Sequence, residues 1–200
     1  TVTVAQSVDA SSAATITAGG NVTVQSASVS SASANTTNAT GGFVAVKTSR
    51  ATIDVTQSHS SASLSGNVDA LGNITLDASN FATQDAFARA QGGGAVDLAS
   101  ASTDGEYTPD TLASIGASAV IRAGGALAVN ATLGASMRST TRVSAAGLGS
   151  DATGSAGSDI IGGTTDAQIG TGANVQARTV SVVAQGSGIA VNADSETFAG

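Results

Sequence analysis

The feature of this sequence that most restricts its fold is a strand-like phrase that returns at a nearly constant interval. It reads GGNVTVQ at 19–25, GNITLDA at 72–78, GGALAVNA at 124–131 and, in a shorter copy, TVSV at 179–182. The first apolar residues of the four copies are separated by 52, 53 and 53 residues: Val22, Ile74, Leu127 and Val180. A constant period of this length is typical of chains built from stacked repeats.

Two further features recur at fixed distances from this phrase. An apolar residue precedes each copy by 5 or 6 residues, with a small or polar turn between: Ile16, Val68, Ile121 and Val175. A second strand-like segment follows three of the copies by 21 residues: Phe43, Ala95 and Leu148. We therefore interpret the repeat of 52–53 residues as about two coils, in units at about 16–67, 68–120 and 121–174 with a partial unit at 175–200.

The alternation of residue types within each copy predicts strands. Apolar side chains two residues apart lie on one face of an extended chain, and the residues between them are mostly Thr, Ala or Ser. Turns are expected where the copies begin, because glycine adopts conformations that other residues avoid and a side-chain amide can hydrogen-bond between turns. The turn residues are Gly19, Gly20, Asn21, Gly72, Asn73, Gly124 and Gly125.

The composition requires a thin interior. Of the 200 residues only 2% are aromatic, so few side chains are large enough to fill a thick core. Short strands, glycine turns and a constant period predict an all-β fold, a parallel β-solenoid that forms one domain over 1–200, with about eight coils. Neither end carries a recognisable cap, so we expect uncapped ends, either in a segment of a longer array or in a subunit that associates with its own copies along the solenoid axis.

The charge and the absence of cysteine exclude several classes of function. The chain has 7 Lys and Arg against 14 Asp and Glu and no basic cluster, which argues against a nucleic-acid partner. No apolar run is long enough to span a bilayer, so we expect no membrane insertion, and the first residues lack the order of a signal peptide. Without cysteine there are no disulfides and no Cys-ligated metals.

One acidic stretch, TDGEYTPD at 103–110, is the candidate metal site. Asp104, Glu106 and Asp110 offer hard oxygen ligands around a glycine, so they form a candidate calcium loop, and calcium is the one cofactor considered. Their spacing matches neither the EF-hand loop nor the glycine-rich nonapeptide, and the stretch occurs in one repeat only. We therefore favour an exposed insertion loop around the single proline.

The sequence lacks the motifs that are usual in enzymes, so we expect no catalytic residues and no enzymatic activity. His59 has no second His and no carboxylate near it in sequence, which favours a surface residue over a ligand or general base. Asp54, Asp69 and Asp77 could line one face of a solenoid, as in polysaccharide-cleaving β-helices, but the chain has few aromatic platforms for a sugar. Neither a nucleophile elbow nor a phosphate loop is present.

The stretch TTDAQIGTGANVQARTVSVVAQGSG at 164–188 combines a short strand, an IGxGA turn and an alternating pair of strand motifs. It resembles the repeats of very large bacterial exported proteins of the filamentous-haemagglutinin and leukotoxin-like adhesin type. The copies SGNVDALGNITLDAS and GASAVIRAGGALAVNAT look like further members of the series. The resemblance implies secretion to the cell surface or beyond, a role as a β-helical stalk, adhesin or matrix fibre, and no catalytic residues in the repeats.

We therefore expect a structural or adhesive rod on or outside a bacterial cell, with a surface receptor or glycan as its partner. The first alternative is a self-assembling subunit of an extracellular filament or sheath. The second is a polysaccharide-active β-helix enzyme.

Overall fold

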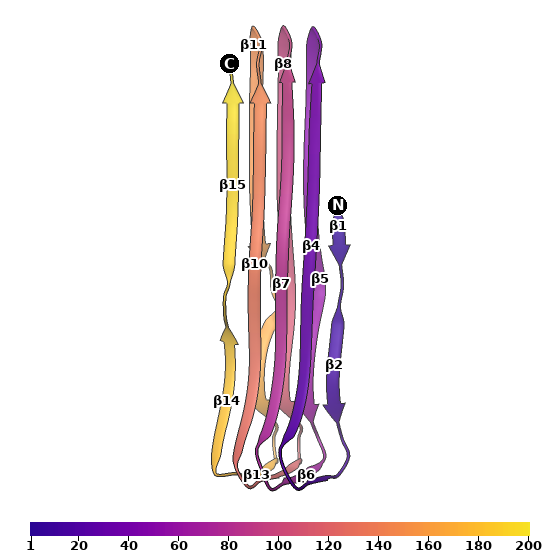
Figure 1. Ribbon diagram of the computed structural model, residues 1–200, viewed down its shortest axis with the longest axis vertical. Coiled ribbons are helices and arrows are strands. Elements are labelled where there is room, and N and C mark those ends of the chain that lie inside the picture. Colours follow the sequence, from indigo (N-terminus) through magenta and orange to yellow (C-terminus); the bar gives the residue numbers. More distant parts are fainter.

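The structure, a computed structural model, describes all 200 residues, and every element in it is a strand (Figure 1). The front sheet consists of β4 (Val22–Gly41), β7 (Ile74–Gly93), β10 (Ala126–Ala145), β14 (Thr179–Gly186) and β15 (Ala190–Ala199). The back sheet consists of β1 (Val2–Val4), β2 (Ser7–Ser12), β5 (Val44–Leu64), β8 (Val96–Ile115), β11 (Gly149–Ile160) and β12 (Thr164–Ile169). The base sheet consists of β3 (Ile16–Ala18), β6 (Asn67–Ala70), β9 (Val120–Ala123) and β13 (Asn174–Gln176). No helix long and apolar enough to cross a membrane is present.

Strands pair in parallel with strands about one repeat away. Val22 pairs with Ile74, Ile74 with Leu127, and Leu127 with Val180, so the four copies of the phrase stack on one another. The back and base sheets pair in the same direction. These sheets confirm the expected all-β, parallel architecture and are consistent with a β-solenoid.

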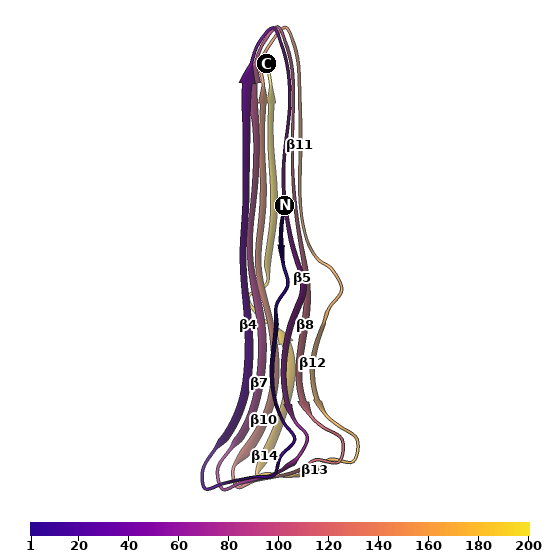
Figure 2. The same cartoon turned by 90° about the vertical axis from the view of Figure 1, so that its right-hand side faces the viewer.

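The interpretation of the repeat as two coils is wrong, because one repeat makes one turn of the chain. Val44, which follows the second strand-like segment at Phe43, pairs with Val96 in the back sheet and has no partner in the front sheet. Each turn runs through one short base strand, along the front sheet to the tip, and back along the back sheet (Figure 2). The base sheet has 4 strands, so the chain passes the base four times and does not form about eight coils.

The length of the strands explains this error. Strand β4 has 20 residues and β5 has 21, whereas strands usually have about five or six. Beyond Val24, the inward positions of β4 are occupied by residues such as Ser26 and Ser28. The apolar alternation therefore ends in the sequence although the strand continues.

The interior contains two apolar clusters with a polar belt between them. The cluster at the base contains large aliphatic side chains, such as Ile74, Leu76 and Ile121, each of which contributes about 1.5–3 kcal/mol by burial. The cluster toward the tip is rich in alanine, including Ala88 and Ala90. Small side chains allow the two long sheets to come close together there, and Figure 2 shows that the sheets converge toward the tip. The belt contains hydrogen-bonded polar side chains: Ser26, Ser28, Ser58, Ser60 and Asn80.

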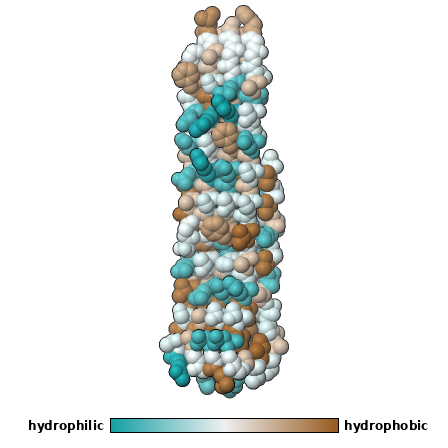
Figure 3. All heavy atoms as spheres, in the orientation of Figure 1, coloured by the Kyte–Doolittle hydropathy of each residue, from teal (hydrophilic) through white to brown (hydrophobic).

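The outer face of the front sheet is mixed in polarity. Figure 3 shows hydrophilic patches next to hydrophobic side chains along the whole height of this face. The outward positions of β7 include Thr83 and Asp85 as well as Phe81, which is 38% exposed. Polar outward positions on a half-buried strand are the ordinary consequence of its two-residue alternation.

Candidate functional site

The acidic stretch at 103–110 lies inside strand β8, so the expected exposed insertion loop is wrong. Strand β8 pairs with β5 on one side and with β11 and β12 on the other. Side chains along it alternate between the interior and the outer face, which leaves Asp104, Glu106 and Asp110 on the outer side. A strand of the back sheet accommodates charges at these positions because only its inner face is packed against the front sheet.

The three acidic residues do not gather around one point. Asp104, Glu106 and Asp110 are spread along the strand, and Asp110 is already bonded to side chains of other turns. Glu106 pairs in register with Asp54 on one side and Asp159 on the other. No group of three or more His, Asp or Glu that could hold a metal ion is found. Calcium binding by this stretch stays a prediction.

His59 lies between two carboxylates of neighbouring turns. Its Nδ1 lies 3.0 Å from Asp110 Oδ2, and its Nε2 lies 3.1 Å from Asp9 Oδ1. Asp110 also accepts a hydrogen bond from the hydroxyl of Thr164 in the following turn. The members of this row lie about one repeat apart, so no carboxylate stands near His59 in the sequence. The repeat period of 52 residues would place His59 opposite Thr111, and only the register shift between Val55 and Ser58 brings it opposite Asp110.

An irregularity in the back sheet opens the surface beside His59. Proline has no N–H for a strand ladder, and the register of β5 against β8 shifts between Val55 and Ser58, opposite Pro109. Gln57 adopts a positive φ of 55° in this shift. The result is a hollow of about 430 Å³, lined by Gln57, His59, Thr108, Pro109, Asp110, Gly163 and Thr164.

The geometry around His59 suits a clamp between turns better than a catalytic base. Both ring nitrogens face carboxylates, so both contacts are donated hydrogen bonds when the imidazole carries two protons. Each ring nitrogen thus already has a carboxylate of another turn within hydrogen-bond distance. The hydroxyl of Thr164 is bonded to Asp110 and not to His59, so the nucleophile–base relay of covalent catalysis is missing.

Two predicted asparagines at the base of the front sheet link successive turns. Asn21 Oδ1 accepts a 2.8 Å hydrogen bond from the Asn73 backbone N–H, and Asn73 Oδ1 accepts a 2.9 Å hydrogen bond from the Ala126 N–H. The expected link along the stack is thus made from amide to backbone and not from amide to amide. A Cβ at Gly72 would lie 2.2 Å from Asn21 Oδ1, and one at Gly125 would lie 2.1 Å from Asn73 Oδ1. These two glycines make room for the asparagine side chains.

The other predicted turn glycines differ in their surroundings. A Cβ at Gly124 would lie 2.2 Å from the Leu71 carbonyl oxygen, so a close approach of two turns requires this glycine. Gly19 and Gly20 have no atom within 4 Å of a Cβ position and face open space.

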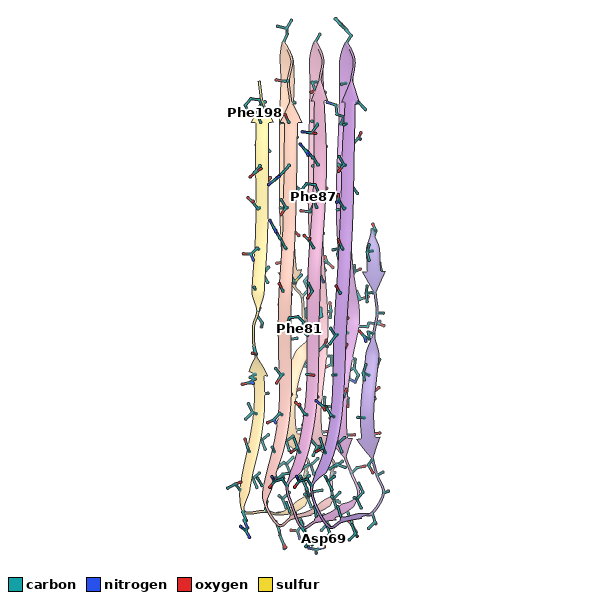
Figure 4. The ribbon with its side chains drawn as sticks, in the orientation of Figure 1. Asp69, Phe81, Phe87 and Phe198 are labelled. Carbon is teal, nitrogen blue, oxygen red and sulfur yellow. The ribbon has the colours of Figure 1, made fainter.

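The carboxylates considered for the polysaccharide-cleaving alternative, Asp54, Asp69 and Asp77, do not share a face. Asp54 lies in β5 of the back sheet, Asp69 in β6 of the base sheet and Asp77 in β7 of the front sheet. Figure 4 shows Asp69 at the base of the molecule. Glycosidases need two carboxylates that flank one bond, which residues on three different sheets do not supply.

Three of the cations gather on the outer side of the front sheet. Arg89 of β7 and Arg142 of β10 are register partners, and Arg138 lies four residues before Arg142. Phe87 stands on β7 and Phe198 on β15 (Figure 4). We call this surface the arginine face, made up of Asp85, Phe87, Arg89, Arg138, Arg142, Glu196 and Phe198. Its members are far apart in sequence and are brought together by the one-turn repeat.

The arginine face contains two shallow hollows that meet at Arg142. One, of about 310 Å³, is lined by Arg89, Glu196 and Phe198 among others, and the other, of about 350 Å³, lies beside Phe87. Arg142 Nε lies 3.2 Å from Glu196 Oε2, and Arg89 forms no ion pair. Because both side chains of the Arg142–Glu196 pair are half-exposed, the pair contributes at most about 1 kcal/mol to stability. Arg142 can therefore exchange Glu196 for another anion.

A buried ion pair joins two turns inside the tip. Lys47 of β5 contacts Asp97 of β8, and both side chains are completely buried. Asp97 Oδ2 also accepts a 3.1 Å hydrogen bond from the Ala146 N–H of the third turn. The hydrogen bond from Lys47 lowers the pKa of the Asp97 carboxyl below its ordinary value, although burial opposes this shift. The Lys47 ammonium occupies the space that a side chain at Gly92 would need.

No family profile, curated protein or solved structure matches this chain. The resemblance of 164–188 to adhesin repeats therefore stays an expectation.

Proposed function

We propose that this chain is a structural segment of a bacterial surface fibre or stalk, which acts outside the cell without catalysing a reaction. The observation that carries the proposal is the parallel pairing of strands about one repeat apart in all three sheets. Pairing of this kind extends by the addition of similar turns, each about 4.8 Å thick. The number of repeats then sets the length of the fibre.

The bonds between turns support a mechanical role. Of 130 backbone–backbone hydrogen bonds, 107 lie within the strands, where they join one turn to the next. Side chains add further links across turns, through Asn21, Asn73 and His59. A load on the stack is therefore shared among many bonds. The resemblance of 164–188 to adhesin repeats agrees with this role and is the reason for the proposed extracellular location.

Single-molecule force spectroscopy on the chain, held by its two ends, tests the mechanical proposal. Each turn of 52 to 54 residues should open as a unit and add roughly 180 Å of contour length, at about 3.5 Å per residue. A series of equal steps supports the proposal. A single smooth extension at low force would mean that the turns resist no load, and the proposal would be wrong.

The filament subunit is the alternative function for the same architecture. Electron microscopy of the purified chain over a concentration series distinguishes a filament subunit from a segment of a longer fibre. Uniform filaments with an axial repeat of one chain would favour the subunit, and dispersed particles at every concentration would favour the segment. The enzyme alternative has no observation in its favour, since its candidate carboxylates lie on three sheets.

We further propose that the arginine face is the adhesive surface and that it binds an acidic glycan. The guanidinium groups of Arg89 and Arg142 match the planar geometry of carboxylates and sulfates. Phe87 and Phe198 add apolar ring surface against which a sugar ring can pack. Three arginines and two carboxylates give the arginine face a net charge of +1, in a chain whose net charge is −7.

Calorimetry with polygalacturonate, and with uncharged dextran as a comparison, tests this binding. The double variant Arg89→Gln/Arg142→Gln should weaken binding about tenfold or more, which corresponds to ~1.4 kcal/mol. Arg50→Gln is the matched control, because Arg50 is exposed on the back sheet. Equal binding of dextran, or an equal effect of Arg50→Gln, would show that the arginine face is not the site.

A further inference from the structure

We propose that Lys47 and Asp97 are joined by an amide bond, which forms an isopeptide cross-link between neighbouring turns. The two side chains lie on adjacent strands of the back sheet, β5 and β8, and contact each other inside the tip. This inference depends only on the interior of the tip and not on the proposed function.

Burial makes this pair of charges costly, although the hydrogen bond from Lys47 favours the ionised Asp97 carboxylate. Both side chains have 0% exposure. An ammonium group has three N–H donors. The Lys47 ammonium donates a hydrogen bond to one acceptor, Asp97 Oδ1, so two of its donors are unmatched. Buried charges with unmatched donors are costly. An amide is neutral and has a single N–H, so condensation removes both charges and most of the unmatched donors.

The packing holds the two groups together. The Lys47 Nζ fills the space beside Gly92, where a side chain would collide with it. Within the back sheet, Lys47 pairs with Ala99 and Asp97 pairs with Ala45, both of which are buried. Groups held in contact in this way react as if they were at very high concentration, with effective molarities of about 10⁵ M or more for well-oriented pairs.

The reaction is a condensation that releases one water. The Lys47 ammonium passes a proton to Asp97 Oδ1, and the freed lone pair of Nζ attacks Asp97 Cγ. Negative charge then develops on Oδ2, where the Ala146 N–H already donates a 3.1 Å hydrogen bond. The Cγ–Oδ1 bond breaks as Oδ1 takes a second proton from the nitrogen and leaves as water. Oδ2 remains as the amide oxygen, the nitrogen keeps one hydrogen, and no electrons are transferred to another molecule.

Mass spectrometry of the intact, denatured chain tests the cross-link directly. The chain should be lighter than its sequence by the mass of one water. Trypsin cleaves after Lys and Arg but not after an acylated Lys47, so 1–50 and 90–122 should appear as one branched peptide. A mass equal to that of the sequence, with normal cleavage after Lys47, would show an ordinary ion pair and overturn the proposal.

Two variants test whether the water is lost in a reaction between Lys47 and Asp97. Lys47→Arg and Asp97→Ala each remove one reacting group, so each should have the mass of its own sequence whether or not it folds. A loss of water that persists in either variant, or that maps to 90–122 without a branch, would point to a succinimide at Asp104–Gly105 and would also overturn the proposal.

Discussion

The backbone N–H of Asn73 donates a 2.8 Å hydrogen bond to the side-chain oxygen of Asn21, one turn earlier in the stack. Asn73 in turn accepts a 2.9 Å hydrogen bond from the Ala126 N–H of the next turn. Each asparagine thus supplies an acceptor to the turn above it, at the point where the chain enters the front sheet. A shift of one residue between turns would break these bonds, so they help to set the register.

The first prediction concerns this asparagine row. Asn21→Ala and Asn73→Ala should each lower the free energy of unfolding by about 1 kcal/mol, because each leaves a backbone N–H without its acceptor. Chemical denaturation measures the change. Asn35→Ala is the control, since Asn35 lies on the exposed outer face of β4 and makes no side-chain hydrogen bond. An equal loss in the control would mean that the row has no special role.

The second prediction concerns Gly134, which is covered by the ring of Phe81 from the neighbouring turn. A Cβ at Gly134 would lie 2.3 Å from Phe81 Cδ2. Gly134→Ala should therefore lower the free energy of unfolding by about 1–3 kcal/mol, as overpacking generally does. Adding Phe81→Ala should recover part of this loss because the colliding ring is gone. Strictly additive effects of the two substitutions would contradict the contact.

The third prediction concerns Asn80 in the polar belt. Its side-chain oxygen accepts hydrogen bonds from Ser58 Oγ at 2.8 Å and from Tyr107 Oη at 2.9 Å, and its amide donates to the Ser58 carbonyl at 2.7 Å. Asn80→Leu leaves these buried partners unpaired and should destabilise the chain by about 1–3 kcal/mol. In a double-mutant cycle, Tyr107→Phe should reduce the cost of Asn80→Leu. A cost independent of residue 107 would exclude this coupling.

The fourth prediction concerns the ionisation of Tyr107. Burial raises the pKa of Tyr107 to about 12, from an ordinary value of 10.0. The unfolded chain therefore loses the phenol proton at a lower pH than the folded chain does. Stability is complete below about pH 10 and falls as the pH rises from there toward 12.

Phenolate absorbance tests this directly, because Tyr107 is the single tyrosine of the chain. The folded chain should titrate near pH 12, and Tyr107→Phe should reduce the loss of stability between pH 10 and 12. A midpoint near 10.0 in the folded chain would show that the phenol is in contact with water.

The fifth prediction concerns the His59 clamp. His59→Ala removes the partner of both Asp9 and Asp110 and should lower the free energy of unfolding by about 0.5–1 kcal/mol, since all three side chains are partly exposed. The difference in the free energy of unfolding between the His59→Ala variant and the unchanged protein should become smaller in high salt, because salt screens exposed charges. A difference that does not depend on salt would mean that His59 acts through packing and not through charge.

The period of the repeat was visible in the sequence for a physical reason. Parallel stacking places equivalent residues of successive turns side by side, so Val22, Ile74 and Leu127 must all suit the same interior position. The number of coils per repeat was not visible. Ser26 and Ser28 face the interior of β4, and small polar residues facing inward leave no hydrophobic alternation from which a long strand could be predicted.

The β-strand character, the parallel stacking period and the positions of the turn asparagines could be predicted from the sequence, because all three depend on residue types repeated at a constant distance. Which residues meet could not be predicted without the three-dimensional structure. His59 faces Asp110, and Lys47 meets Asp97, because each pair lies on neighbouring turns with side chains on the same side of one sheet. That side changes with every residue along a strand, so a contact between turns depends on the exact register, which the repeat period alone does not specify.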